Sequence, residues 1–186
     1  MNNYIIIAGV NGTGKSSLRG VLEGQGTPLG HIIDADAIAK KNNFDNIKAG
    51  KQAVSQIKYC LDNNISFTQE TTLAGHRTER TLRQARKQGY FITMYYIGLN
   101  SKEESILRIA NRVRKGGHNI PDADVIRRFE NRIESLSKVI PLCDKVVFYD
   151  NENGFIKVAE IVNNKFSYTN GHRPQWLSEI KEELNL

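Results

Sequence analysis

Short apolar runs alternate along the chain with longer stretches in which apolar residues recur every three or four positions. This alternation predicts a parallel sheet with helices packed on its faces. The runs that fit strands are residues 4–8, 30–33, 66–70, 91–97 and 145–149. The predicted fold class is therefore α/β, with a mostly parallel sheet between layers of helices.

Helical periodicity fills the intervals between these runs. It predicts a first helix around Leu18 and then helices over about residues 47–63, 76–88 and 102–115. Gly89 ends the third of these in the usual position after a helix, and Ser101 begins the fourth as part of a capping box. Gly116 and Gly117 then break the pattern, and Pro121 opens one more helix whose apolar positions continue to Leu136.

The last part of the chain has a different pattern. Residues 155–162 and 165–168 flank Asn163-Asn164, a pair typical of a tight hairpin turn, and residues 174–184 are amphipathic. The pattern leaves open whether this hairpin joins the main sheet. No linker separates a second unit, so we expect one domain over residues 1–186, with a core at 1–151 and the hairpin and helix at 152–186.

Composition narrows the class of protein. The 186 residues, 39% hydrophobic and 25% charged, exclude a disordered or fibrous chain. Cys60 and Cys143 stand alone, which excludes a disulfide framework or zinc site and favours a reducing cytoplasm. No run is long enough for a membrane helix, and the start of the chain lacks the features of a signal peptide. We expect a cytoplasmic protein that begins at or near Met1.

The net charge of +6 and the pI near 9.3 imply anionic partners. The segment that follows the first predicted strand identifies one of them. It reads Gly9-Val10-Asn11-Gly12-Thr13-Gly14-Lys15-Ser16-Ser17 and contains a complete Walker A pattern. Its glycines let backbone N–H groups surround phosphate oxygens, Lys15 reaches the β- and γ-phosphates, and the Ser16 hydroxyl ligates Mg²⁺. The motif predicts a nucleoside triphosphate site.

Other motifs decide the kind of phosphate-loop protein. Asn164-Lys165 lacks the following carboxylate with which a GTPase reads guanine, and a transporter's Leu-Ser-Gly-Gly signature does not occur. A small kinase remains, in which a mobile basic lid closes over the transferred phosphoryl group. The lid predicted here is residues 108–132, where arginine and lysine outnumber acidic residues around Gly116-Gly117.

A second basic stretch runs over residues 77–87. Arg77, Arg80, Arg83 and Arg86 recur every third residue and form one stripe of an amphipathic helix. We favour the interpretation that this stripe is a solvated helix face. The alternative is a surface for nucleic acid or an acidic partner.

Carboxylates follow two of the predicted strands. Asp34 and Asp36 come after the second strand, and Glu70 ends the third before Thr71 and Thr72. Transfer of a phosphoryl group to a hydroxyl needs a carboxylate that takes the proton, and such groups lie at the carboxyl ends of strands in this class. An Asp at a strand end also serves as a helix N-cap, which is the alternative for each Asp.

These residues together resemble the zeta-toxin-like P-loop kinases, which include UDP-N-acetylglucosamine kinases of bacterial toxin–antitoxin systems. The resemblance extends from Tyr4 to about Asn151. The matching segments are residues 11–19, Asp34-Ala35-Asp36, residues 70–73, residues 86–90, Gly117-His118 with Pro121, and Tyr149-Asp150-Asn151.

The resemblance implies a kinase that uses ATP and Mg²⁺ to phosphorylate a hydroxyl of a UDP-amino sugar. In it Asp36 is similar to the catalytic base, Lys15 to the phosphate-neutralising lysine, and Glu70 and Thr72 to substrate contacts, with Asp34 and Thr71 beside them. Arg112 and Arg128 match the family's lid arginines best, with Arg108 and Arg132 in reserve. An antitoxin protein is implied as a partner if the chain is a toxin, and nucleic acid and membranes are not expected partners.

Two further hypotheses stay open from the sequence. The basic clusters motivate a kinase of nucleosides or polynucleotide ends, and the arginine stripe motivates a non-enzymatic protein whose interactions depend on a bound nucleotide.

Overall fold

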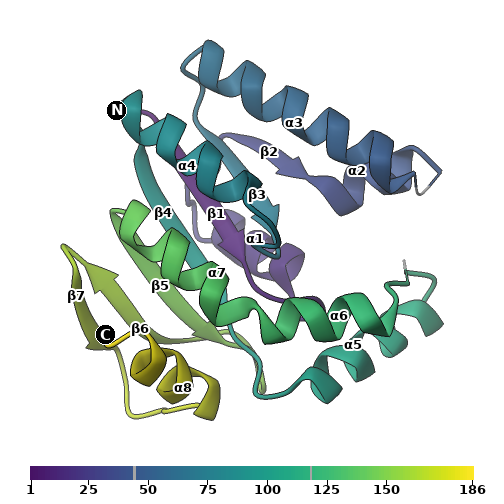
Figure 1. Cartoon of the computed structure of the whole chain (residues 1–186), viewed down its shortest axis with the longest axis vertical. Coiled ribbons are helices and arrows are strands. Elements are labelled where there is room, and N and C mark those ends of the chain that lie inside the picture. Colours follow the sequence, from purple (N-terminus) through teal and green to yellow (C-terminus); the bar gives the residue numbers. More distant parts are fainter. Residues whose placement is uncertain (44, 118) are drawn as a thin grey trace.

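The computed structural model of the chain describes residues 1–43, 45–117 and 119–186. Its centre is a seven-stranded sheet with the order β2-β3-β1-β4-β5-β6-β7 (Figure 1). Five strands are parallel: β1 (Asn3–Ala8), β2 (His31–Asp34), β3 (Phe67–Thr71), β4 (Phe91–Ile97) and β5 (Lys145–Asp150). The α/β class and all five predicted strands are thereby confirmed.

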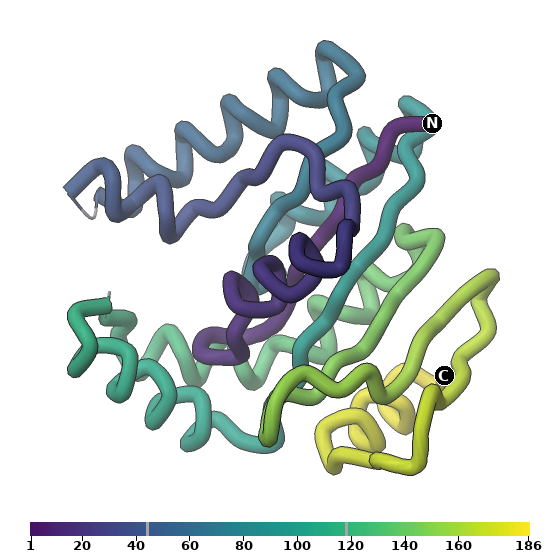
Figure 2. The backbone as a smooth tube through the Cα atoms, turned by 180° about the vertical axis from the view of Figure 1, so that it is seen from behind, coloured from purple at the N-terminus to yellow at the C-terminus, as the bar shows by residue number. Residues whose placement is uncertain are grey.

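Helices cover both faces of this sheet. Their bounds are α1 (Lys15–Gly24), α2 (Ala35–Lys41), α3 (Asn46–Asp62), α4 (Arg77–Lys87), α5 (Lys102–Arg114), α6 (Asp122–Glu130), α7 (Arg132–Val139) and α8 (Gln175–Glu183), with a 3₁₀ turn at Ile140–Leu142. Side chains of α3, α4, α7 and α8 share one core with the sheet, and α1 packs on the opposite face, which Figure 2 shows from behind. Because helices cover both faces of the sheet, a site can form only in the loops at the ends of the strands.

β1 is buried on both faces, which explains its unbroken apolar run. Tyr4, Ile6 and Ala8 belong to the core under α3, α4 and α7, whereas Ile5 and Ile7 pack with Leu18 and Leu22 of α1. A parallel strand in the middle of a sheet needs apolar residues at every position for this reason. Because β1 is central, the loop that follows it opens in the middle of the sheet edge.

One helix was not predicted, and one helical prediction was wrong. The helix that was not predicted is α2, a short helix whose first turn directly follows β2. The Asp34 side chain caps it by accepting hydrogen bonds from the backbone N–H groups of Asp36 and Ala37, each at 3.0 Å. The helix expected from Pro121 through Leu136 is two helices, because the chain turns at Asn131 between α6 and α7.

The C-terminal hairpin, whose place relative to the main sheet the sequence leaves open, joins that sheet. β6 (Ile156–Val162) pairs antiparallel with β5, and β7 (Lys165–Tyr168) pairs with β6, so the hairpin extends the main sheet. Asn163 and Asn164 have φ of 52° and 60°, and these positive values suit the tight turn that joins β6 to β7. The predicted closing helix is α8, and its Trp176 is 1% exposed.

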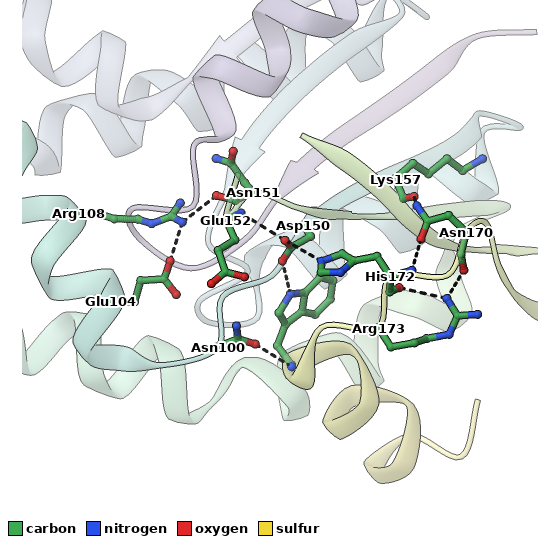
Figure 3. Close-up of polar contacts among 11 residues, drawn as sticks. Asn100, Glu104, Arg108, Asp150, Asn151, Glu152, Lys157, Asn170, His172 and Arg173 are labelled. Carbon is green, nitrogen blue, oxygen red and sulfur yellow. Dashed lines mark hydrogen bonds and ion pairs between the residues drawn. The ribbon is translucent and has the colours of Figure 1, made fainter. Parts of the chain in front are cut away.

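Trp176 attaches α8 to the sheet through two polar contacts (Figure 3). Its indole Nε1 donates to Asp150 Oδ1 at 2.8 Å, and its backbone N–H donates to Asn100 Oδ1 at 3.2 Å. In the part of the chain that the structure describes, no helix has both the length and the apolar character of a membrane span.

Gly98 tests this packing. An added Cβ there would lie 2.0 Å from the Trp176 ring, and the buried indole has no room to move. We expect Gly98→Ala to lower the free energy of unfolding by about 2 kcal/mol or more, as overpacking does. Urea unfolding followed by circular dichroism measures it.

Gly20→Ala is the matched control. Gly20 lies inside α1 with nothing within 4 Å of the added Cβ, so alanine should raise the free energy of unfolding by about 0.5–1 kcal/mol. Equal effects of the two substitutions would contradict the packing argument.

Candidate active site at the phosphate loop

The loop between β1 and α1 has the backbone that its glycines predict. Gly12 and Gly14 adopt φ of 79° and 93°, a region that residues with a side chain rarely enter. At Gly14 an added Cβ would lie only 2.7 Å from Asn151 Nδ2. Thr13 is fully buried, and its hydroxyl donates to the Val10 carbonyl at 3.1 Å. The predicted motif therefore forms a compact loop at the start of a helix.

Lys15 is the first residue of α1, and its side chain folds back onto the phosphate loop. Its Nζ donates to the carbonyl oxygens of Gly9 and Val10 at 3.0 and 3.1 Å. The pKa of Lys15 is lowered to about 8, mainly by burial; Asp36 and Glu70 act in the opposite direction, and the charges of Arg112 and Arg128 add smaller contributions that lower it. All four of these charged side chains are predicted site residues. The structure places them close enough to the Lys15 ammonium group to affect its pKa.

Glu70 is a buried carboxylate at the end of β3. Ser16 Oγ donates to Glu70 Oε2 at 2.8 Å, and Arg19 Nη1 lies 2.9 Å from Oε1 in an ion pair that lacks hydrogen-bond alignment. Burial raises the pKa of Glu70, and neighbouring Asp34 raises it too, whereas Ser16 and Arg19 act in the opposite direction. In the sheet register Glu70 lies beside both Ile7 of β1 and Asp34 of β2.

Asp34 and Asp36 have different roles in the structure. The Asp34 carboxylate is 10% exposed, caps α2, and lies 3.4 Å from Arg19 Nη1. The N-cap alternative is thus correct for Asp34. Asp36 lies in the first turn of α2, is exposed, and lines the same cavity as Lys15.

This cavity has a volume of about 620 Å³ and opens between the strand ends, α3, α4 and α6. Most of the predicted site residues line it. They are Asn11, Lys15, Asp34, Asp36, Glu70, Thr71, Thr72 and Arg128. Arg77 and Arg80 of α4 line it as well, whereas the sequence favours a solvated helix face for the stripe to which they belong.

Thr71 and Thr72 follow Glu70 in a tight turn. The Thr71 hydroxyl accepts from the backbone N–H of Leu73 at 3.0 Å and lies 3.4 Å from the hydroxyl of Thr78 in α4. Leu73 is buried with φ of 59°, a left-handed conformation unusual for leucine. Thr71 therefore holds a strained turn that leads into α4, while Thr72 is half-buried at the cavity wall.

The helices of the predicted lid contact the phosphate loop directly. Arg128 Nη1 donates to Asn11 Oδ1 at 3.0 Å. Arg112 lines a second, more open cavity of about 640 Å³, together with Gly12, Arg108 and Asn151. His118, which belongs to the predicted lid turn, lies outside the described residues.

The two reserve arginines have other partners. Arg108 donates to Glu104 at 2.6 Å and to the Asn151 carbonyl at 2.8 Å (Figure 3). Arg132 pairs with Glu179 of α8 and lies 3.9 Å over the Phe129 ring, away from the loop. Arg108 thus lies at the second cavity, and Arg132 links α8 to the end of α6.

Sequence reasoning missed Arg19 as a site residue and gave Asn151 no definite contact. Asn151 Nδ2 donates to the Thr13 carbonyl at 2.9 Å, which ties the segment after β5 to the loop. Arg19 follows Ser16 by three residues on α1, so both side chains point to Glu70. The three-residue spacing of Ser16 and Arg19 on a predicted helix was the sequence signal that could have identified Arg19 as a site residue.

The sheet order and the phosphate loop together define the P-loop kinase fold. The chain belongs to the Zeta toxin family, whose model matches residues 45–159. That match includes Glu70, Arg112 and Arg128, while the phosphate loop and Asp36 precede it. An uncharacterized protein of Haemophilus influenzae is 33% identical over 131 residues, which cover 68% of this chain and 91% of that protein.

Solved structures share the fold. A chain from the PezAT chromosomal toxin–antitoxin system of Streptococcus pneumoniae superposes with a TM-score of 0.63 at 15% identity, over 100% of this chain and 86% of that one. The AvrRxo1-ORF1:-ORF2 complex with ATP gives 0.68 at 13% identity, over 99% of this chain. This chain spans 63% of that AvrRxo1 chain, so the longer protein has parts without a counterpart here.

Arg19 allows a test of the buried carboxylates. Arg19→Met removes the cation that faces both Asp34 and Glu70, so we expect a loss of about 1–3 kcal/mol in the free energy of unfolding at pH 7.5. Arg19 lowers the pKa of Glu70, so its removal lets the folded protein bind a proton at Glu70 more readily than the unmodified protein does. Protonation offsets part of the lost compensation, and the loss should therefore be smaller at pH 5.0.

Urea unfolding at the two pH values measures this difference. Arg83→Met is the control, because Arg83 pairs with Glu79 on the exposed side of α4 and such pairs contribute about 0.5 kcal/mol or less. Equal losses for both variants, or a loss independent of pH, would count against the charge-compensation role of Arg19.

Proposed function

We propose that this protein is an ATP-dependent phosphotransferase that transfers the γ-phosphoryl group to a hydroxyl of a UDP-amino sugar such as UDP-N-acetylglucosamine. One observation carries the proposal. A single cavity is lined by Lys15 of the phosphate loop, by the exposed carboxylate of Asp36 and by Arg128 of the lid. A phosphate-binding lysine, a proton acceptor and an arginine facing the same space are the parts that phosphoryl transfer to an alcohol requires.

The reaction follows from these positions. Asp36 takes the proton of the acceptor hydroxyl, the hydroxyl oxygen attacks the γ-phosphorus, and the bond between that phosphorus and the oxygen of ADP breaks. Lys15 and the lid residues Arg112 and Arg128 neutralise the charge that spreads over the γ-phosphoryl oxygens. Arg128 is half-buried and held by Asn11, so its guanidinium is oriented before the reaction.

The site also fits Mg²⁺. Glu70 Oε1 is buried without a hydrogen bond in the described structure, and the Ser16 hydroxyl lies 2.8 Å from Oε2. Mg²⁺ in such sites takes one or two protein oxygens together with phosphate oxygens and water. Ser16 and Glu70 would hold the ion, which when bound supplies charge neutralisation at the β- and γ-phosphates.

The UDP-sugar acceptor rests on the family resemblance and on the size of the cavity. About 620 Å³ lies within the range of small-molecule sites. The polynucleotide alternative has less support, because Arg83 pairs with Glu79, and Arg86 donates to the Leu142 carbonyl at 3.1 Å and lies 3.8 Å from Asp144. Half of the stripe thus has partners within the protein.

A toxin role and an antitoxin partner are part of the same proposal. The PezAT neighbour comes from a toxin–antitoxin system. A neutralising protein would act most simply by covering the mouth of the cavity that holds Asp36.

Asp36→Asn tests the base. The variant keeps the size of the side chain but cannot accept the proton, so we expect the rate of phosphoryl transfer to fall by about 10²–10⁴. ATP affinity should stay within about threefold of that of the unmodified protein. Mass spectrometry of UDP-N-acetylglucosamine incubated with ATP and Mg²⁺ measures transfer, and calorimetry measures ATP binding.

Asp62→Asn is the control, since Asp62 is exposed at the end of α3 and pairs with Lys58 on the same helix. It should transfer at the normal rate. An Asp36→Asn variant that turns over at the normal rate would show that another group takes the proton.

Lys15 predicts a pH dependence of nucleotide binding. Its pKa is lowered to about 8, so above that pH the free protein carries a mostly neutral amine. Triphosphate binding favours the charged form, so binding takes up a proton, and affinity should fall by up to about tenfold per pH unit above 8.

Calorimetric titration of ATP at pH 7.5, 8.5 and 9.5 measures this. Lys15→Arg stays cationic throughout and should show little change over the same range. A flat profile for the unmodified protein would be inconsistent with a neutral Lys15 above pH 8.

A further inference from the structure

The end of the cavity away from the phosphate loop is formed by α4. Arg77 and Arg80 lie three residues apart on this helix and both line the cavity. Both are exposed, and among the described residues no carboxylate lies within ion-pair distance of either guanidinium. Arg83 and Arg86, farther along the same stripe, pair with Glu79 and Asp144. Arg83 and Arg86 therefore form ion pairs within the protein, whereas Arg77 and Arg80 face the cavity.

Arg77 extends across the cavity toward α3. An ideal Cβ built at Gly50 of α3 would lie 4.0 Å from Arg77 Nη1. The residues that α3 contributes to the cavity wall are Gly50, Ala53, Val54 and Ile57. None of the four carries a charge, so the wall opposite the arginines offers no compensating carboxylate.

The carboxylates of the cavity do not balance these arginines. Asp34 and Glu70 contact Arg19, and Asp36 acts on the ammonium of Lys15. Lys15 and Arg128 lie at the phosphate-loop end, where the transferred group is expected. The remaining positive charge is thus concentrated at the α4 end of the same cavity.

We propose that Arg77 and Arg80 form a subsite for an anionic phosphate or diphosphate group of the acceptor. Guanidinium groups bind phosphate oxygens in a bidentate manner, and two of them on one helix face match a diphosphate. The acceptor would then bind at two points, with its phosphate on α4 and its hydroxyl at Asp36. This inference rests on the proposed function, because it assigns specificity to the same cavity: acceptors without a phosphate are poor substrates.

Kinetics of the full chain test the subsite. The acceptors are UDP-N-acetylglucosamine, N-acetylglucosamine 1-phosphate and neutral N-acetylglucosamine. For the double variant Arg77→Met/Arg80→Met we expect KM for UDP-N-acetylglucosamine to rise at least tenfold, with kcat within threefold of normal. Arg77→Lys/Arg80→Lys should recover part of the affinity.

The control is Arg83→Met/Lys87→Met, which removes the same charge from the same helix outside the cavity and should change KM by less than twofold. Circular dichroism confirms that each variant is folded. An unchanged KM for Arg77→Met/Arg80→Met, or an unmodified protein that uses neutral N-acetylglucosamine as well as the two phosphates, overturns the subsite.

Binding of UDP separates this inference from the proposed function. The nucleotide site is first saturated with a non-hydrolysable ATP analogue and Mg²⁺, and UDP is then titrated by calorimetry. If UDP binds and Arg77→Met/Arg80→Met weakens it at least tenfold, the subsite stands even where no acceptor is phosphorylated and the proposed function fails. If UDP does not bind, or binds both proteins equally, the subsite is wrong even where transfer to a sugar is observed.

Discussion

The structure around the phosphate loop depends on a buried negative charge. Glu70 is 9% exposed at the end of β3, and a carboxylate in such a place is costly unless cations or donors face it. Ser16 and Arg19 of α1 supply a hydrogen bond and an ion pair. This requirement fixes the rotation of α1 about its axis, because both side chains must point to β3. The same rotation places Lys15 over the loop.

Sheet order makes this arrangement possible. β3 lies between β1 and β2, so Glu70 and Asp34 end side by side next to the strand that carries the phosphate loop. Asp34 then caps α2, and the first turn of that helix presents Asp36 to the cavity. The Asp34 carboxylate thus positions α2, and α2 carries the Asp36 carboxylate. Conversion of Asp34 to a residue without an acceptor would affect Asp36 through the backbone of α2.

The sequence predicted most of the fold and the phosphate-loop half of the site. Buried strands are continuous apolar runs, and the Walker A pattern requires a particular loop, so both are visible without coordinates. α2 was missed because it is a single short element whose start depends on the Asp34 cap. The pair Arg77 and Arg80 was missed for a different reason: only the folded chain shows which arginines have carboxylate partners and which face a cavity. Arg19 was missed although its spacing from Ser16 on a predicted helix is visible in the sequence.

The C-terminal hairpin and helix act on the site, although they lie outside the core that the motifs define. Asp150 accepts a hydrogen bond from the Trp176 indole of α8, and the next residue, Asn151, donates to the phosphate loop at Thr13. At the start of α7, the Arg132 side chain is 9% exposed between Glu179 of α8 and the Phe129 ring of α6. α6 carries Arg128, which holds Asn11 from the other side of the loop. The loop contacts of Asn151 and Arg128 therefore start from segments that α8 anchors, while Ser105 of α5 adds a third side-chain contact by donating to the Asn11 carbonyl. α8 thus contributes to the geometry of the phosphate site.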